Sequence, residues 1–124
     1  MIPKFRAWMP SLQWMCEVLA ISWDDKYCDV CYLGDTERNT EMTVDFDEIE
    51  LIQSTGLFDA NGREVFAGDI VLINRPPFDC QGVVKYYNGC WWIVCGGIAF
   101  SLYDEVEESL VIGNIYENPE LVEG

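Results

Sequence analysis

The side chains that could do chemistry in this chain are its six cysteines and its 22 acidic residues, because histidine is absent. Without an imidazole, the usual general base near neutral pH is missing, and a nucleophilic cysteine or serine would need another activating group. Asp59, Glu64 and Asp69 are close in sequence and could form an acid/base pair or a divalent metal site. We expect structural roles for Asp59 and Asp69 instead, because aspartates beside glycine-containing turns readily accept backbone hydrogen bonds. The sequence therefore predicts no catalytic residue and no enzyme activity.

The cysteines are expected to be free thiols. No apolar segment follows the first residues Met-Ile-Pro-Lys-Phe-Arg, which predicts no secretory signal and a reducing, cytoplasmic location in the cell that makes the protein. Cys28 and Cys31 have zinc-ligand spacing, and Cys90 with Cys95 could supply a second pair. However, residues 27–33 are rich in β-formers, and residues three apart in a strand point to opposite faces, where they cannot share a metal. We therefore expect neither a metal nor a cofactor.

Residues 55–73 carry the most distinctive pattern, an Asn61-Gly62 turn followed by Gly68-Asp69 and an apolar run. Both residue pairs favour turns, because glycine and asparagine tolerate positive φ and aspartate accepts hydrogen bonds from turn amides. This segment resembles the T-G-L-x-D-x-N-G-x-E-[VI]-[YF]-x-G-D-I-V signature of the YopX family of phage and prophage proteins, and residues 4–8 and 111–121 resemble two further parts of the family pattern. The resemblance implies a small, largely β phage or prophage protein, located in the cytoplasm of a bacterial host cell. Its structural signature positions would be Gly56, Asp59, Asn61, Gly62, Gly68, Asp69, Gly113 and Asn114.

Short β-rich segments separated by turns predict an all-β, mainly antiparallel fold with at most short helices. The expected strands are residues 4–9, 14–23, 27–33, 48–54, 70–73, 81–87, 90–96, 98–103 and 110–116. Residues 70–73 have two apolar faces, which is typical of a strand inside a sheet. A bulge is expected at Gly113, a rigid loop at residues 75–79 and one helical turn within residues 105–110.

A chain of 124 residues has room for one domain. We expect a β-rich part at residues 1–54, the signature and a small SH3-like or barrel-like part at 55–118, and a tail at 119–124. No apolar run approaches the length of about 18 residues that a membrane-spanning helix needs. The sequence therefore predicts no association with a membrane.

The clearest local prediction is a hairpin around Asn88-Gly89, a pair that favours a two-residue type I′ turn. The turn fixes the register, with Tyr87 opposite Cys90 and Lys85 opposite Trp92. One face then carries Val84, Tyr86, Trp91 and Ile93, and the other carries Val83, Lys85, Tyr87, Trp92 and Val94. Both faces are too apolar to be left in water, so a second layer of the chain or another subunit is expected to cover them. The candidate interface is Lys85, Tyr87, Trp92 and Val94.

The formal net charge of −15 bears on possible partners. It disfavours direct binding to nucleic acid, because negative charge repels phosphates at long range. It also raises the possibility that the protein imitates nucleic acid, which would require the carboxylates to cluster. The candidate acidic patch consists of Asp35, Glu37, Glu41, Asp45, Asp47, Glu48 and Glu50. A solvated face that keeps an apolar protein soluble is the favoured interpretation of these residues.

Two functions follow from these observations. The first is a non-catalytic phage or prophage accessory protein that acts by protein–protein binding and self-associates as a homo-oligomer. The alternative is an acidic inhibitor of a host nucleic-acid-handling defence system, such as an anti-restriction or anti-CRISPR protein that acts as a DNA mimic.

Overall fold

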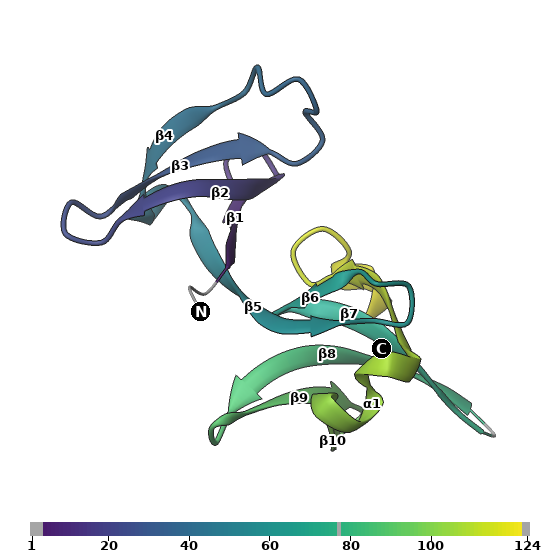
Figure 1. Cartoon of the computed structure of the whole chain (residues 1–124). Helices are drawn as coiled ribbons and strands as arrows, with labels where there is room; N and C mark the ends of the chain where they lie inside the picture. Colours follow the sequence, from purple (N-terminus) through teal and green to yellow (C-terminus); the bar gives the residue numbers. More distant parts are fainter. Residues whose placement is uncertain (1–3, 77, 123–124) are drawn as a thin grey trace. The chain divides into compact units, whose positions relative to one another are not determined.

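The computed structural model describes residues 4–76 and 78–122 (Figure 1). The described residues contain eleven β-strands, one short α-helix and three 3₁₀ helices. The predicted all-β, antiparallel class is therefore confirmed. The chain forms two compact units, Met1–Gln53 and Ser54–Gly124, called unit 1 and unit 2 below. We expected the boundary between the β-rich part and the barrel-like part after residue 54; the boundary between the two units lies after residue 53.

Unit 1 is an antiparallel sheet in the order β4-β3-β2-β1-β5. Its strands are β1 (Phe5–Met9), β2 (Trp14–Ser22), β3 (Tyr27–Tyr32), β4 (Met42–Asp45) and the first part of β5 (Glu50–Phe58). The strands expected at 14–23 and 27–33 form an antiparallel hairpin, in which Ser22 pairs with Tyr27 across the turn Asp24-Asp25-Lys26. A bulge interrupts β2 between Val18 and Ala20. The core of unit 1 consists of Ala7, Met9, Cys16, Cys28, Val30 and Val44.

The predicted end of the strand at residues 48–54 was wrong. Residues Phe46–Glu48 form the 3₁₀ helix η1, and β5 continues through Gly56, whose φ is +77°. The register of β5 shifts between Ser54 and Phe58. Side-chain hydroxyls replace the missing ladder bonds there, since the Gly56 amide donates to Ser54 Oγ (3.0 Å) and Thr55 Oγ1 donates to the Val65 carbonyl (2.7 Å). The glycine therefore bends the strand without ending it.

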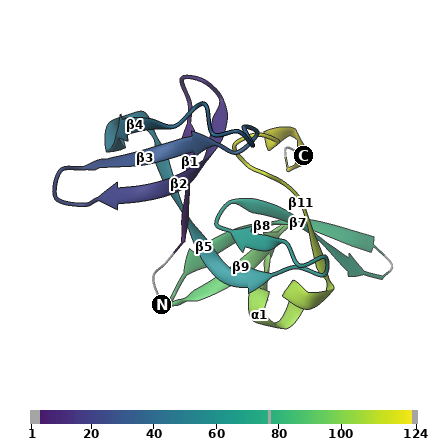
Figure 2. The ribbon, with the colours of Figure 1, turned by 45° about the horizontal axis from the view of Figure 1, so that its top comes forward.

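Unit 2 contains β6 (Glu64–Phe66), which pairs with the second part of β5, and a five-stranded sheet in the order β10-β9-β8-β7-β11 (Figure 2). Its strands are β7 (Asp69–Arg75), β8 (Phe78–Tyr87), β9 (Cys90–Cys95), β10 (Ile98–Ser101) and β11 (Ser109–Asn114). The interior position expected for residues 70–73 is confirmed, because β7 lies between β8 and β11. The core consists of Val65, Val71, Ile73, Val84, Trp91, Ile93, Leu102, Val106 and Val111.

Three boundaries in unit 2 differ from the prediction. The rigid loop is shorter than residues 75–79, because β7 runs to Arg75 and β8 begins at Phe78, while residue 77 lies outside the described residues. The strand expected at 98–103 ends at Ser101, where the helix α1 (Leu102–Glu105) begins and buries Leu102 completely. The 3₁₀ helix η2 (Val106–Glu108) follows. The helical segment begins at Leu102, before the helical turn expected within residues 105–110, and the burial of Leu102 and Val106 in the core explains this start.

The C-terminal part of unit 2 contains the expected bulge. Val111 pairs with Val71 and Gly113 with Ile70, so the register of β11 shifts between Val111 and Gly113. A Cβ atom at Gly113 would lie 2.6 Å from Asn118 Oδ1, which explains why a residue without a side chain stands there. The described part of the predicted tail contains the 3₁₀ helix η3 (Pro119–Leu121).

Candidate protein-binding site

The β8–β9 hairpin has the predicted register. Tyr87 pairs with Cys90, Tyr86 with Trp91 and Lys85 with Trp92. Asn88 and Gly89 have φ values of +52° and +77°, as a type I′ turn requires. The turn chemistry of the sequence therefore determined which side chains share a face.

Two aromatic pairs lie at the tip of this hairpin, one on each face. On the core side, Tyr86 and Trp91 form an edge-to-face pair with ring centroids 5.0 Å apart. On the opposite side, Tyr87 and Trp92 stack at 5.4 Å, and Trp92 Nε1 donates a hydrogen bond to the Tyr87 carbonyl (3.0 Å). Tyr86 is 60% exposed and Tyr87 39% exposed, whereas Trp91 is buried. The tip thus presents rigid, partly exposed aromatic rings.

The second face of the hairpin is only partly covered. We call it the outer hairpin face; it consists of Val83, Lys85, Tyr87, Trp92 and Val94. Lys85 and Tyr87 are exposed, and the other three are half-buried. Ala99 of β10, which pairs with Val94, extends this surface and is also exposed. The four residues predicted as an interface are therefore brought together on one side of the sheet.

The candidate acidic patch divides into two groups at the ends of β4. Asp35, Glu37 and Glu41 lie in the segment before this strand, and Asp45, Asp47 and Glu48 lie at its end and in η1; Glu50 begins β5. Four strand residues span about 13 Å, so the seven carboxylates do not form one dense cluster along β4. Arg38 also contacts Glu41 (3.7 Å) and Glu17 (3.6 Å), which reduces the negative charge of the first group.

The three carboxylates considered for catalysis take part in structural hydrogen bonds. Asp59 Oδ1 accepts from the amides of Asn61 and Arg63 (both 2.9 Å), and its Oδ2 accepts from the Val111 amide (2.8 Å). Asp69 Oδ2 accepts from the buried Phe66 amide (2.8 Å). Glu64 Oε2 accepts from a serine hydroxyl, Ser54 Oγ (2.6 Å). These carboxylates hold the backbone of unit 2 in place.

Comparison with known proteins identifies the family. Residues 4–123 match the family described as YopX protein. The chain belongs to the YopX family. The resemblance seen in the three sequence segments is therefore confirmed. A solved structure of protein EF1440 from Enterococcus faecalis has a similar fold, with 30% sequence identity, coverage of 99% of each chain and a TM-score of 0.69. No curated protein matches the chain.

The signature of this YopX protein connects its turns to β11. Asp59 joins the turn before β6 to Val111, and the Ala60 amide donates to the Ser109 carbonyl (2.9 Å). Asn114 Oδ1 accepts from the amides of Tyr116 (3.0 Å) and Glu117 (2.8 Å). The glycines have positive φ where turns or bends need it, at Gly56, Gly62 and Gly68. These contacts explain the positions of Asp59, Gly62, Gly68 and Asn114 in the signature by the turns and bends that they form in this chain.

The cysteines of the YopX protein fall into three groups. Cys80 and Cys95 form a disulfide between β8 and β9, so the expectation of free thiols was wrong for this pair. Their Cα atoms lie 6.3 Å apart, within the range that a disulfide can bridge. Cys90 is free and exposed, and Cys16, Cys28 and Cys31 are free and buried. Cys28 packs in the core of unit 1, whereas Cys31 contacts Thr40 Oγ1 (3.6 Å), as expected for opposite faces of β3.

Two of the buried thiols, Cys16 and Cys28, are poor nucleophiles. Burial raises the pKa of both Cys16 and Cys28 to about 11; the neighbouring thiols of Cys31 and Cys28 raise it further at Cys16, and the Asp29 carboxylate does so at Cys28. A thiol with this pKa is almost fully protonated at neutral pH.

Among the described residues, no group of three or more cysteine, aspartate or glutamate side chains is arranged to hold a metal ion. The described chain also lacks a helix long and apolar enough to cross a bilayer.

The disulfide predicts the number of reactive thiols. The unreduced protein, unfolded in denaturant, should react with a thiol reagent at four of its six cysteines. The reduced protein should react at six, and the variant Cys80→Ser/Cys95→Ser should react at four with or without reductant. A count of six for the unreduced wild-type protein, purified without reductant, would contradict the pairing.

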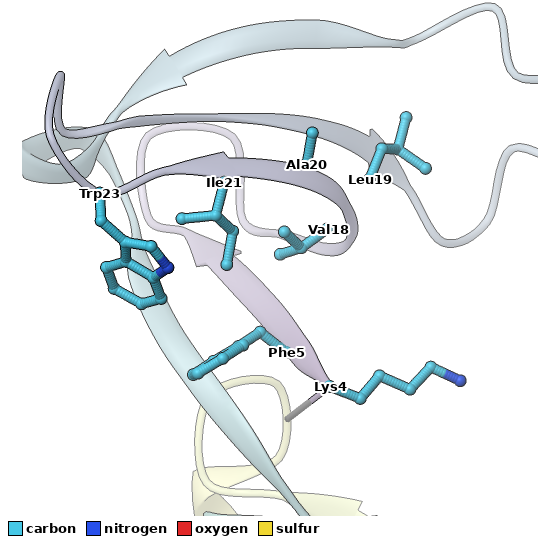
Figure 3. Close-up of a pocket in the computed structure, with 7 residues that line it drawn as sticks. All are labelled: Lys4, Phe5, Val18, Leu19, Ala20, Ile21 and Trp23. Atoms are coloured by element: carbon cyan, nitrogen blue, oxygen red, sulfur yellow. The ribbon is translucent and has the colours of Figure 1, made fainter. Parts of the chain in front are cut away.

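One feature that the sequence did not reveal is an apolar hollow in unit 1 (Figure 3). It has a volume of about 630 Å³ and is lined by Lys4, Phe5, Val18, Leu19, Ala20, Ile21 and Trp23. Trp23 follows the last residue of β2, and we expected it only to end a strand. The signal available in the sequence was an aromatic residue directly before the polar turn Asp24-Asp25-Lys26, which favours exposure of the ring.

Proposed function

We propose that this YopX protein is a non-catalytic phage or prophage accessory protein that acts in the host cytoplasm by binding protein, including a second copy of itself. The observation that carries the proposal is the outer hairpin face, where Tyr87 and Trp92 stack beside the half-buried Val94. Tyrosine and tryptophan are the residues most often responsible for binding energy at protein interfaces. Lys85 is exposed on the same face and suits its rim.

The geometry of the hairpin supports binding rather than chemistry. The stacked rings are held by a type I′ turn and by the Trp92–Tyr87 hydrogen bond, so little conformational freedom remains to be lost on association. β10 is the edge strand of the sheet next to β9 and continues the surface with the exposed Ala99. A second copy that covers this region would remove apolar surface from water on both molecules.

The alternative function, a DNA-mimicking inhibitor of a host defence system, receives less support. Mimicry requires a dense row of negative charges, since duplex DNA carries about one charge per 1.7 Å of its axis. The candidate acidic patch instead forms two groups separated by β4, and Arg38 lies among the first of them. Competition with duplex DNA for a basic host nuclease would be the measurement that favours this alternative.

If the protein self-associates through the outer hairpin face, the oligomer should persist at high salt. Light scattering after size exclusion should give a mass above that of one chain, 14.2 kDa, at both low and high salt, because apolar contacts are not screened. Replacing Tyr87 by serine and Val94 by threonine should weaken the association by about tenfold or more. Threonine keeps the β-branched shape of valine, so the strand itself should persist.

The control is Tyr103→Ser, which removes a more exposed aromatic ring (56%, against 39% for Tyr87) that lies on α1. This variant should associate like the wild-type protein. Circular dichroism of all variants should show the same folded state. A wild-type protein that stays monomeric at high concentration would refute the role of the outer hairpin face. Equal weakening of the association by Tyr87→Ser/Val94→Thr and by Tyr103→Ser would refute it as well.

A further inference from the structure

The apolar hollow of unit 1 shares two of its lining residues with the layer of side chains that packs against the hydrophobic core. Figure 3 shows Val18 and Ile21 pointing into it from β2, with Phe5 of β1 on the opposite side and Trp23 at one end. Val18 and Ile21 also pack against the core of unit 1. The hollow of about 630 Å³ lies within the size range of ligand-binding pockets, about 300–1,000 Å³. An apolar group that enters it would contact side chains that the core already holds in place.

Trp23 is the central residue of an aromatic row. Its ring makes edge-to-face contacts with Phe5 (5.9 Å between centroids) and with Phe46 (5.7 Å). It nevertheless remains 58% exposed, which is a large exposure for a tryptophan fixed by two neighbours. Such a ring offers an apolar surface and a π-face that attracts cations.

A second hollow lies at the other end of this row. It has a volume of about 330 Å³ and is lined by Asp25, Lys26, Asp45, Phe46 and Asp47. Phe46 lines this acidic hollow and contacts Trp23, which lines the apolar hollow. Three carboxylates and one ammonium group therefore face a cavity next to an apolar one.

We propose that unit 1 binds a basic segment of a partner protein that places a bulky apolar side chain in the apolar hollow and an adjacent lysine or arginine at the acidic hollow. The apolar side chain would bury surface against Phe5, Ile21 and Trp23. The cation would form charge-assisted hydrogen bonds with Asp25 and Asp47 and approach the π-face of Trp23. The net charge of −15 would attract such a segment at long range.

Charge complementarity selects this occupant. A nucleic acid or an anionic membrane would be repelled by the carboxylates that line the acidic hollow. A second copy of this chain is a poor source of the basic segment, since it carries only seven basic residues against 22 acidic ones. The site lies in unit 1 and is separate from the outer hairpin face, so it adds a partner class to the proposed function.

The proposal is tested with three labelled synthetic peptides of equal length. One combines leucine and lysine, one leucine and glutamate, and one serine and lysine. Fluorescence anisotropy should show saturable binding of the leucine–lysine peptide to the full-length protein. Both other peptides should bind at least about tenfold more weakly, because each lacks one of the two required properties.

Two pairs of variants locate the site. Trp23→Ala should weaken binding of the leucine–lysine peptide by about tenfold, whereas Phe58→Ala, which removes a 52% exposed ring from unit 2, should leave it unchanged. Asp25→Asn/Asp47→Asn should weaken it several-fold and reduce its salt dependence. Asp104→Asn/Glu107→Gln changes the net charge equally at exposed positions of unit 2 and should have no effect.

The outcomes separate this proposal from self-association. The variant Tyr87→Ser/Val94→Thr should bind the peptide like the wild-type protein, so the failure of one proposal leaves the other intact. Equal weakening by the two charge variants would show a general attraction between opposite charges and overturn the proposal. Absence of binding, equal affinity for all three peptides, or full affinity of Trp23→Ala would overturn it as well.

Discussion

Replacing Asp59 by alanine should lower the free energy of unfolding of this YopX protein by about 3 kcal/mol or more. Asp59 is 6% exposed, and its carboxylate accepts hydrogen bonds from three backbone amides, those of Asn61, Arg63 and Val111. A buried donor that loses its acceptor costs about 1–3 kcal/mol. The Val111 amide is 52 residues away in sequence, so its bond joins the turn before β6 to β11 across unit 2.

The Asp59→Asn variant isolates this long-range bond. The asparagine oxygen can still accept from Asn61 and Arg63, but its amide group would face the Val111 amide, where two donors meet. We therefore expect a smaller loss than with alanine, about 1–3 kcal/mol. Urea denaturation followed by tryptophan fluorescence measures both values, because Trp91 lies in the core of unit 2.

The stability should also depend on pH through this carboxyl group. Burial raises the pKa of Asp59, but hydrogen bonds from Val111, Arg63 and Asn61 and the charge of Arg63 outweigh burial, so the pKa lies below its ordinary value. A carboxyl group with a depressed folded-state pKa contributes stability above its unfolded-state pKa of about 3.9 and loses that contribution as the pH falls through the folded-state value. The stability difference between wild type and Asp59→Asn should therefore shrink below about pH 4.

The control for Asp59 is Glu107→Ala, which removes an exposed carboxylate of η2. This substitution should change the free energy of unfolding by less than about 0.5 kcal/mol. A change of the same small size for Asp59→Ala, or a difference between wild type and Asp59→Asn that is constant with pH, would contradict the role assigned to Asp59.

The parts of the fold that follow from local chemistry were predictable from the sequence. Asn88-Gly89 specifies a type I′ turn, and such a turn leaves only one register for β8 and β9. The bulge at Gly113 was likewise visible as a glycine in an apolar strand. The course of β5 was not, because its continuation through Gly56 depends on Thr55 donating to the Val65 carbonyl of another strand.

The candidate sites were predictable to different degrees. The outer hairpin face follows from the same register as the hairpin, so alternation along the strands was enough to group Lys85, Tyr87, Trp92 and Val94. The apolar hollow requires two segments to meet: the start of β1, and the bulged part of β2 with the Trp23 that follows it. The Cys80–Cys95 disulfide similarly depends on the distance between two strands, which the spacing of the cysteines does not reveal.

Gly82→Ala should lower the free energy of unfolding by an amount near the upper end of the 1–3 kcal/mol typical of overpacking. Gly82 lies buried in β8, and a Cβ atom there would come 2.5 Å from Ile93 Cγ2 and 3.0 Å from the Val94 carbonyl oxygen. The Ile93 side chain is fully buried in the core and cannot move aside without disturbing its neighbours. Thermal unfolding followed by circular dichroism should show a correspondingly lower Tm.

A double-mutant cycle tests the cause of this loss. Ile93→Leu removes the β-branched methyl group that the new Cβ atom would strike, while it keeps the side-chain volume. The double variant Gly82→Ala/Ile93→Leu should therefore be more stable than the sum of the two single effects predicts, by about 1 kcal/mol. Strict additivity would show that the contact between Gly82 and Ile93 is not responsible. A rescue would establish that β8 carries a glycine at position 82 because the core side of β9 already fills the space above it.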